Sequence, residues 1–345
     1  HERPGVYSAY DASAVVSGSG GGKVVGLAAL CTGAAAGEAV RITRYEDAVS
    51  AFGSGEEICE LIRLLLLNGA AAVDAVPAAD ESGYAAAFAA LEAVEDVAVV
   101  VCDSTTLAVQ QALRDSVKAA SEARRERIAV VGGKAGENAT ALVQRAEGLN
   151  SERVVLTAPV GEGGGAAVAA LVHHASRRRK KREQADRQSL PTDGAELKGV
   201  DGLEARYGDT EIDTLVRGGV TPVEQAAGVV SVVRGVTTRT KTGEAADATW
   251  RELTTIRIVD DVIPTVRDAL RARFRRAKNT EQSRGAIRSQ VVLELENKLA
   301  REIITGYGEV SVEADADNPT VCLVDFSFTV AHGLNQIWLS AHITV

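Results

Sequence analysis

The sequence predicts a chain of two parts, an α/β domain with a parallel sheet followed by an α+β domain. Between residues 24 and 175, short apolar runs alternate with helical patterns, and three of these runs are apolar on both faces. Strands that are apolar on both faces are typical of a parallel sheet covered by helices on both sides. In the last third, the pattern changes to two long helices and then to strands with alternating apolar residues.

The elements of the α/β part follow one another in a regular order. Strands are expected at 23–29 and 39–42, and a helix over 58–66 is ended by Asn68-Gly69. The next elements are expected to be helix 84–94, strand 97–102, helix 107–123, strand 128–131, helix 139–147 and strand 154–157. We expect right-handed crossovers between these strands.

The last third begins with a strand at 229–234 and continues with two helices. The first helix is expected to begin near Asp261, which we interpret as its N-cap. Apolar residues recur every four positions in both helices: Val262, Val266, Leu270 and Phe274, then Ile287, Val291, Leu295, Leu299 and Ile303. One face of the next strand carries Cys322, Val324, Phe326, Phe328 and Val330.

Both ends of the sequence are expected to be extended. Strict alternation over 336–345 places five apolar residues on one face of a strand: Ile337, Leu339, Ala341, Ile343 and Val345. Residues 3–10 also read as extended, and the Gly/Ser-rich stretch at 17–22 is typical of a flexible coil. Such ends predict strand exchange between subunits. The expected contacts of the N-terminal arm are Val6, Tyr7, Ala9 and Tyr10.

The composition of the 345 residues is ordinary for a globular protein, with 46% hydrophobic and 25% charged residues. A net charge of −9 disfavours binding to nucleic acid. No apolar stretch approaches the ~20 residues of a membrane span, and no secretion signal is recognisable before Arg3. The four cysteines lie far apart, which favours reduced, buried thiols in a cytoplasmic setting: Cys31, Cys59, Cys102 and Cys322.

A basic run at 177–182 opens a polar stretch that extends to about residue 208. We interpret residues 176–208 as a solvated, mobile connection. The alternative is a nucleic-acid-binding tail, but no aromatic residue is interleaved with the charges for base stacking.

The sequence contains few residues in patterns that are typical of catalytic sites. The Gly-rich loops at 132–136 and 161–165 follow strands, but neither matches the dinucleotide fingerprint or the P-loop. The adjacent His173 and His174 cannot point the same way on a helix, and no G-x-S-x-G motif accompanies them. The sequence therefore predicts no catalytic residue, cofactor or metal site. An α/β nucleotide-binding enzyme of the cytoplasm stays as the alternative, favoured by the parallel sheet and the Gly-rich loops.

Several segments carry a resemblance to a known family. Residues 2–7, 232–238, 250–253, 256–260, 286–291 and 321–345 resemble, in this order, the contractile tail sheath proteins of phages and phage-tail-like bacteriocins. The basic run is a departure, because the family has a short Ser-Leu-Thr-Asn-type segment there.

The resemblance implies a structural subunit that is not an enzyme and has no cofactor. Such subunits stack as hexameric rings around an inner tube and contract to drive the tube through a target cell envelope. Implied partners are other copies, the tail tube protein, and baseplate and tail terminator proteins, with no nucleic acid or membrane. The particle, a virion or bacteriocin tail, would be assembled in the cytoplasm of a bacterial host.

The resemblance also implies a domain division. An N-terminal arm and hinge would span 1–22, and an outer, subtilisin-like α/β domain without the protease triad would span 23–240. An inner domain built from both chain ends would span 241–345, with a donated strand at 335–345.

One basic stripe is a candidate contact. Arg267, Arg271 and Arg275 repeat every four residues and share one face of the first long helix. Two interpretations stay open: a solvated face or intersubunit ion pairs, or a contact with acidic groups on the inner tube.

Overall fold

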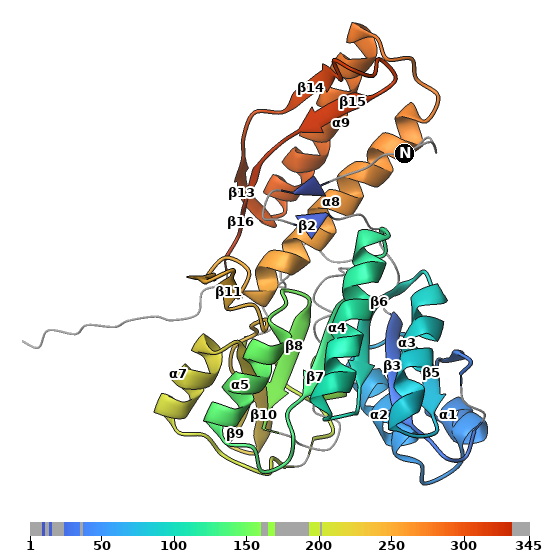
Figure 1. Cartoon of the computed structure of the whole chain (residues 1–345), viewed down its shortest axis with the longest axis vertical. Coiled ribbons are helices and arrows are strands. Elements are labelled where there is room, and N and C mark those ends of the chain that lie inside the picture. Colours follow the sequence, from blue (N-terminus) through green and yellow to red (C-terminus); the bar gives the residue numbers. More distant parts are fainter. Residues whose placement is uncertain are drawn as a thin grey trace, which may run out of the picture.

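The computed structural model of the chain describes residues 9–10, 14–15, 24–34, 37–159, 165–169, 193–200 and 202–332. An α/β part occupies the lower half of Figure 1, and a narrower unit built around two long helices projects above it. We call this narrower unit, which consists of helices and strands between residues 253 and 330, the distal unit.

The α/β part is built on an eight-stranded sheet in the order β10-β9-β8-β7-β6-β3-β5-β4. Its six central strands are parallel, and antiparallel strands lie at both edges. The strands are β3 (Val24–Leu30), β4 (Val40–Ile42), β5 (Ala72–Ala78), β6 (Val97–Cys102), β7 (Ile128–Gly132), β8 (Val154–Ala158), β9 (Val220–Ala226) and β10 (Val229–Val232). The predicted parallel-rich sheet is confirmed.

Helices cover both faces of this sheet. The helices of the α/β part are α1 (Tyr45–Phe52), α2 (Glu57–Leu67), α3 (Tyr84–Ala93), α4 (Leu107–Glu122), α5 (Ala139–Leu149) and α7 (Asp209–Arg217), with the 3-10 turn η1 (Glu81–Gly83) before α3. Apolar residues of α3, α4, α5 and α7 share one buried cluster with the sheet. Those of α1, α2 and the first half of α8 share the other. The fully apolar strands are therefore explained by burial on both sides.

The distal unit consists of a helical hairpin and strands. Helices α8 (Leu253–Phe274) and α9 (Glu281–Ala300) pack against each other and against β13 (Ile304–Tyr307), β14 (Ser311–Ala314), β15 (Cys322–Asp325) and β16 (Phe328–Val330). Short β11 (Lys241–Thr242) and β12 (Ala245–Ala246) pair with each other ahead of α8. The two predicted helices are present. The single strand predicted over 322–330 is divided into β15 and β16, which pair with different strands.

The predicted start of the first long helix is wrong. Helix α8 begins at Leu253, so Asp261 lies within the helix and pairs with Lys298 at 2.5 Å. Ile256 and Val259 of α8 face the sheet, whereas Ile258 faces the distal unit. A helix that is buried on two sides lacks the single apolar stripe that marks a surface helix, and for this reason its first turns were missed.

The predicted mobile connection over 176–208 is wrong for its last part. The N–H of Gly194 donates to the carbonyl of Val232 at 2.7 Å, and the N–H of Leu197 donates to that of Val230 at 2.8 Å. Leu197 is buried. Residues 194–197 therefore cover the edge strand β10, and we call them the edge strap. The basic run at 177–182 lies outside the described residues.

Most of the two predicted donor segments lies outside the described residues, including Val6, Tyr7 and the whole of 335–345. Ala9 and Tyr10 form β1 (Ala9–Tyr10), which pairs antiparallel with β2 (Ala14–Val15) of the same chain.

Candidate functional site

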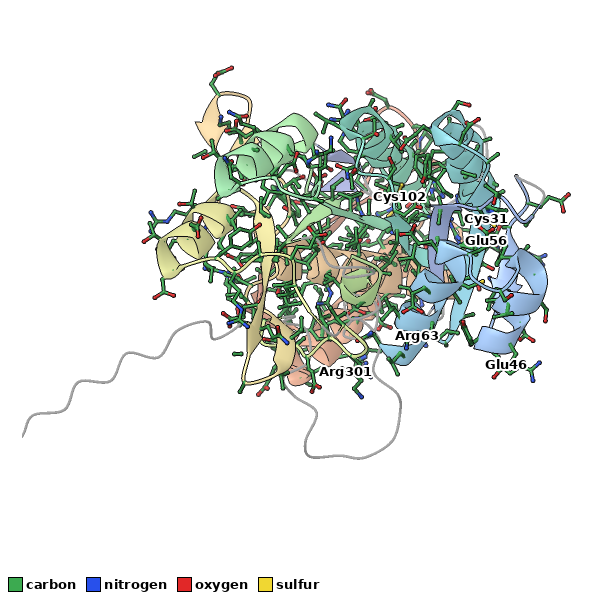
Figure 2. All side chains as sticks on the ribbon, turned by 90° about the horizontal axis from the view of Figure 1, so that it is seen from below. Cys31, Glu46, Glu56, Arg63, Cys102 and Arg301 are labelled. Carbon is green, nitrogen blue, oxygen red and sulfur yellow. The ribbon has the colours of Figure 1, made fainter. Side chains whose placement is uncertain are left out.

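The carboxyl edge of the sheet is where an α/β fold binds small ligands, at the point where neighbouring strands are reached by connections in opposite directions. Here that point lies between β3 and β6, because β5 flanks β3 on the other side. Figure 2 labels Cys31, which follows β3, and Cys102, which ends β6.

Polar side chains at this point hydrogen bond to one another. Asp103 accepts a hydrogen bond from the N–H of Leu30 at 2.9 Å and another from the Tyr84 hydroxyl. Burial raises the pKa of Asp103. The Ser104 hydroxyl donates to Glu81 at 3.0 Å. The chain's own side chains satisfy one another where a nucleotide would bind, which does not favour the nucleotide-binding alternative.

The Gly-rich loop after β7 is explained by packing. A Cβ at Gly133 would lie 2.4 Å from Cδ2 of Leu142 on α5. The N–H of Lys134, which a phosphate would use, donates to Glu137 at 2.9 Å, and Glu137 also pairs with Arg145 at 2.6 Å. A carboxylate therefore already occupies the anion position of this loop. Residues 161–164 of the other Gly-rich loop lie outside the described residues.

The described residues also show where the histidines, cysteines and other possible metal ligands lie. The described residues contain no cluster of three or more His, Cys, Asp or Glu side chains able to hold a metal ion. Four of the five histidines lie outside the described residues, and the fifth, His332, is exposed. All four cysteines are free, as predicted; three are buried and Cys322 is half-buried. None of the helices in the described ranges is long and apolar enough to cross a membrane.

The strands of the distal unit form one long, bent hairpin, which we call the distal hairpin (residues 304–330). Its outer half pairs β14 with β15, and its inner half pairs β13 with β16. The N–H of Gly308 donates to the carbonyl of Ser327 at 2.9 Å and links the two halves. Within the described residues no third strand joins either half, so both long edges are open. An open edge presents unpaired N–H and C=O groups to which another strand can add.

One face of the distal hairpin is apolar and only partly covered. Alternate residues of β15, β16 and the link between them pack toward α8 and α9, yet each stays half-buried: Val324, Phe326, Phe328 and Val330. The rings of Phe326 and Phe328 are stacked with centroids 6.4 Å apart. Because these apolar side chains stay partly exposed next to edges that can accept another strand, this surface is the main candidate site for association.

The predicted basic stripe is only partly exposed. Arg267 is buried and pairs with Glu126 of the α/β part at 3.2 Å. The prediction that Arg267 belongs to an exposed stripe is therefore wrong. Arg271 is half-buried and Arg275 is exposed. Helical spacing placed the three on one face, but that face turns toward the α/β part at Arg267 and toward solvent at Arg275.

Charged side chains join α8 to the α/β part. Arg153, just before β8, donates to both carboxylate oxygens of Asp260 at 2.9 and 3.0 Å. Burial raises the pKa of Asp260. Arg127, just before β7, donates instead to backbone carbonyls at the end of α3, with the carbonyl of Leu91 at 2.6 Å. The amino ends of the central strands are therefore fixed to their surroundings by buried arginines.

Sequence patterns do not bring Glu126, Arg153 and Asp260 together as a group. The available signal was local: Glu126-Arg127 stands directly before the apolar strand β7, and Arg153 directly before β8. A charge at such a position needs a partner, but the partner lies 107 residues away for Arg153 and 141 residues away for Glu126.

Comparison with known families assigns the class of protein. Residues 78–238 match the central domain of phage tail sheath proteins, and residues 245–344 match the phage tail sheath C-terminal domain. The chain belongs to the phage tail sheath proteins, a family of structural proteins of contractile particles.

Individual relatives agree with this assignment. The tail sheath protein of Bacillus phage SP01 is 27% identical over 252 residues, which are 72% of this chain and 43% of that protein. The chain thus spans less than half the length of this relative.

Solved structures share the fold at low identity. The helical sheath of the anti-feeding prophage in its contracted state has a TM-score of 0.72 at 17% identity and covers 99% of both chains. A chain of the baseplate of the same particle gives 0.73 at 17% identity over 100% of both chains. The sheath tail protein of Desulfitobacterium hafniense gives 0.68 at 11% identity, covering 94% of this chain and 100% of that chain.

Proposed function

We propose that this chain assembles by strand exchange into the contractile sheath of a phage tail or a related particle. The observation that carries the proposal is the distal hairpin, which has open edges and a half-covered apolar face. Strands added from neighbouring copies would pair these edges and cover that face. The segments suited to the task are 335–345, with its alternating apolar residues, and the arm before residue 17.

The domain division follows from this arrangement. Residues 1–22 form the arm, residues 23–240 an outer domain whose doubly wound sheet fits a subtilisin-like architecture, and residues 241–345 the inner domain. The first half of α8 also contributes to the core of the sheet, so the two proposed domains are joined through this helix and not through a loose linker.

The proposed assembly is a stack of hexameric rings around an inner tube. Exchanged strands would keep neighbouring subunits connected while the rings rotate and shorten during contraction. The similarity to a sheath solved in its contracted state and to a baseplate chain supports this proposal. The proposed location is the tail of a virion or particle, assembled in the host cytoplasm, with tube, baseplate and terminator proteins as partners.

A truncation tests the strand exchange. Deleting residues 335–345 should abolish sleeves and rings in negative-stain electron microscopy, while circular dichroism retains the helical signal of the described core. Replacing Ile337, Leu339 and Ile343 by Ser should have the same effect. The matched control replaces Gln336 and Thr344, on the other face of the predicted strand, by Ser and should leave assembly intact. Normal sleeves from the truncated chain would contradict the proposal.

A further inference from the structure

Helix α8 leaves the core of the α/β part near Pro264. Up to Ile263, the helix contributes to the buried cluster of the sheet. Beyond it, Val266 and Leu270 belong to the cluster of the distal unit. Pro264 lies inside the helix and has no N–H, so the usual hydrogen bond to the carbonyl of Asp260 cannot form. Prolines are the commonest sites of helix bending, and this one lies where α8 passes from one buried cluster to the other; we call this point the hinge.

A buried ion pair ties α8 to the α/β part just beyond this hinge. Nη2 of Arg267 donates to Oε1 of Glu126 at 3.2 Å, and the two side chains are 1% and 5% exposed. Glu126 belongs to the connection between α4 and β7. The pair therefore joins the distal side of the hinge to the body of the α/β part.

The carboxylate of this pair is poorly satisfied. Its second oxygen, Oε2 of Glu126, is buried and has no hydrogen-bond partner in the described part of the chain. Besides Arg267, the charged groups around the pair are Asp260 and Asp268 from α8, Arg153 from the start of β8, and Arg124 from the α4–β7 connection. Since Arg153 is shared with Asp260, two carboxylates compete for the nearby arginines.

This environment favours the protonated carboxyl. Burial raises the pKa of Glu126 from 4.5 to about 7, and the charge of Asp260 adds to the rise. Burial also lowers the pKa of Arg267. A buried ion pair is stabilising only when additional hydrogen bonds offset the loss of water, and Oε2 lacks one.

We propose that Glu126 and Arg267 form an acid-closed latch on the hinge at Pro264, so that pH sets how tightly the distal unit is held. In the closed state Glu126 contacts Arg267 as described. In the open state α8 bends at Pro264, and water reaches the carboxylate.

The direction of the effect follows from proton linkage. Once the latch opens, the pKa of Glu126 returns to its ordinary value of 4.5, so the closed state binds the proton more tightly. Closing is favoured as pH falls through about 7, and the gain is complete near pH 4.5. Above pH 7 the closed state carries the full cost of a buried, ionised carboxylate. The difference between the two pKa values limits the change in the closed-to-open ratio, from high to low pH, to roughly 300-fold.

The latch is a property of one chain and is independent of sheath assembly. It is measured as a distance between spin labels at Lys118→Cys on α4 and Asn297→Cys on α9, both exposed positions. Cys322→Ser removes the half-buried native thiol from labelling. An excess of unlabelled chain keeps the measured distances within one molecule.

We expect a single narrow distance distribution at pH 5.5 and a second, displaced population at pH 8.5, and the displaced population should grow as pH rises towards about 7. Glu126→Gln, a neutral isostere, should keep the narrow distribution at every pH. The matched control is Glu122→Gln, an exposed carboxylate four residues earlier, which should respond as the unaltered chain does. Pro264→Ala should reduce the displaced population at pH 8.5.

The measurement on the chain without substitutions at Glu126 or Pro264 tests the latch even if a variant fails to fold. A distance distribution that is the same at pH 5.5 and 8.5 would overturn the latch. So would a pH response that persists unchanged in a folded Glu126→Gln variant, and an undiminished displaced population in Pro264→Ala would overturn the hinge.

Discussion

The guanidinium of Arg153 meets both carboxylate oxygens of Asp260 and thereby fixes the amino end of β8 to the first half of α8. Arg153 is 4% exposed and Asp260 16% exposed, so the pair is largely screened from water. Arg153 also donates to the carbonyl of Arg127 at 3.2 Å, which links β7 to the same junction. This pair lies on the α/β side of Pro264, where α8 is part of the sheet's core.

Breaking this pair should destabilise the chain strongly. Asp260→Ala removes both acceptor oxygens and leaves the buried Arg153 without its carboxylate, and the loss expected for one partner of a buried pair is about 3–5 kcal/mol. The measurement is the urea midpoint followed by circular dichroism. As a control, Arg217→Met removes an exposed ion pair with Asp213 and should change stability by less than about 1 kcal/mol. Equal shifts in the two variants would contradict the assigned role of Arg153–Asp260.

The edge strap depends on one amide side chain. Oδ1 of Asn68 accepts a hydrogen bond from the N–H of Lys198, next to the strap, at 2.8 Å. Nδ2 of Asn68 donates to the carbonyl of Lys198, also at 2.8 Å. Asn68→Ala should cost about 1–3 kcal/mol, because the part-buried N–H and carbonyl of Lys198 lose their partners. It should also speed proteolysis near residues 193–200. Asn297→Ala, at an exposed site on α9, is the control; if its cleavage rate matched that of Asn68→Ala, the amide would not hold the strap.

Two glycines with positive φ allow the cost of backbone strain to be measured apart from the cost of crowding by neighbouring atoms. Gly219 has φ +79°, and a Cβ there would lie 2.9 Å from the carbonyl oxygen of Thr237. Gly228 has a similar φ of +83° but open space around it. Gly228→Ala should cost about 1 kcal/mol through strain alone, whereas Gly219→Ala should cost more because the backbone must also move. Thermal unfolding measures both, and a larger loss for Gly228→Ala would contradict the packing described for the turn before β9.

The tube contact is now expected at the solvent end of the basic stripe. Arg271→Glu with Arg275→Glu should reduce assembly on tubes if these side chains meet acidic groups, with each exposed pair contributing about 0–1 kcal/mol. Co-sedimentation with tubes at low and high salt measures the effect, and high salt should weaken it. The control is Arg217→Glu on α7. Unimpaired assembly of the double variant on tubes would exclude the stripe as the contact.

Local sequence was sufficient for most of the α/β part. Strands such as β6 and β7 are short apolar runs, and the helices between them carry single apolar stripes, so each element is encoded within its own residues. Asn68-Gly69 ended α2 as predicted, and the alternation of residues 322–330 appears as alternating burial. The sequence determined these features because burial on one side, or on both faces of a strand, leaves a regular local pattern.

Tertiary structure alone decided where α8 begins, where Arg267 points and what the edge strap does. Residues 253–263 are buried by the sheet on one side and by the distal unit on the other, so no stripe separates apolar from polar positions. The partners of Arg153 and Arg267 lie more than a hundred residues away, and spacing along a helix cannot show which carboxylate faces an arginine. A local pattern records whether a residue meets water, whereas an ion pair between distant segments exists only after the core has brought them together.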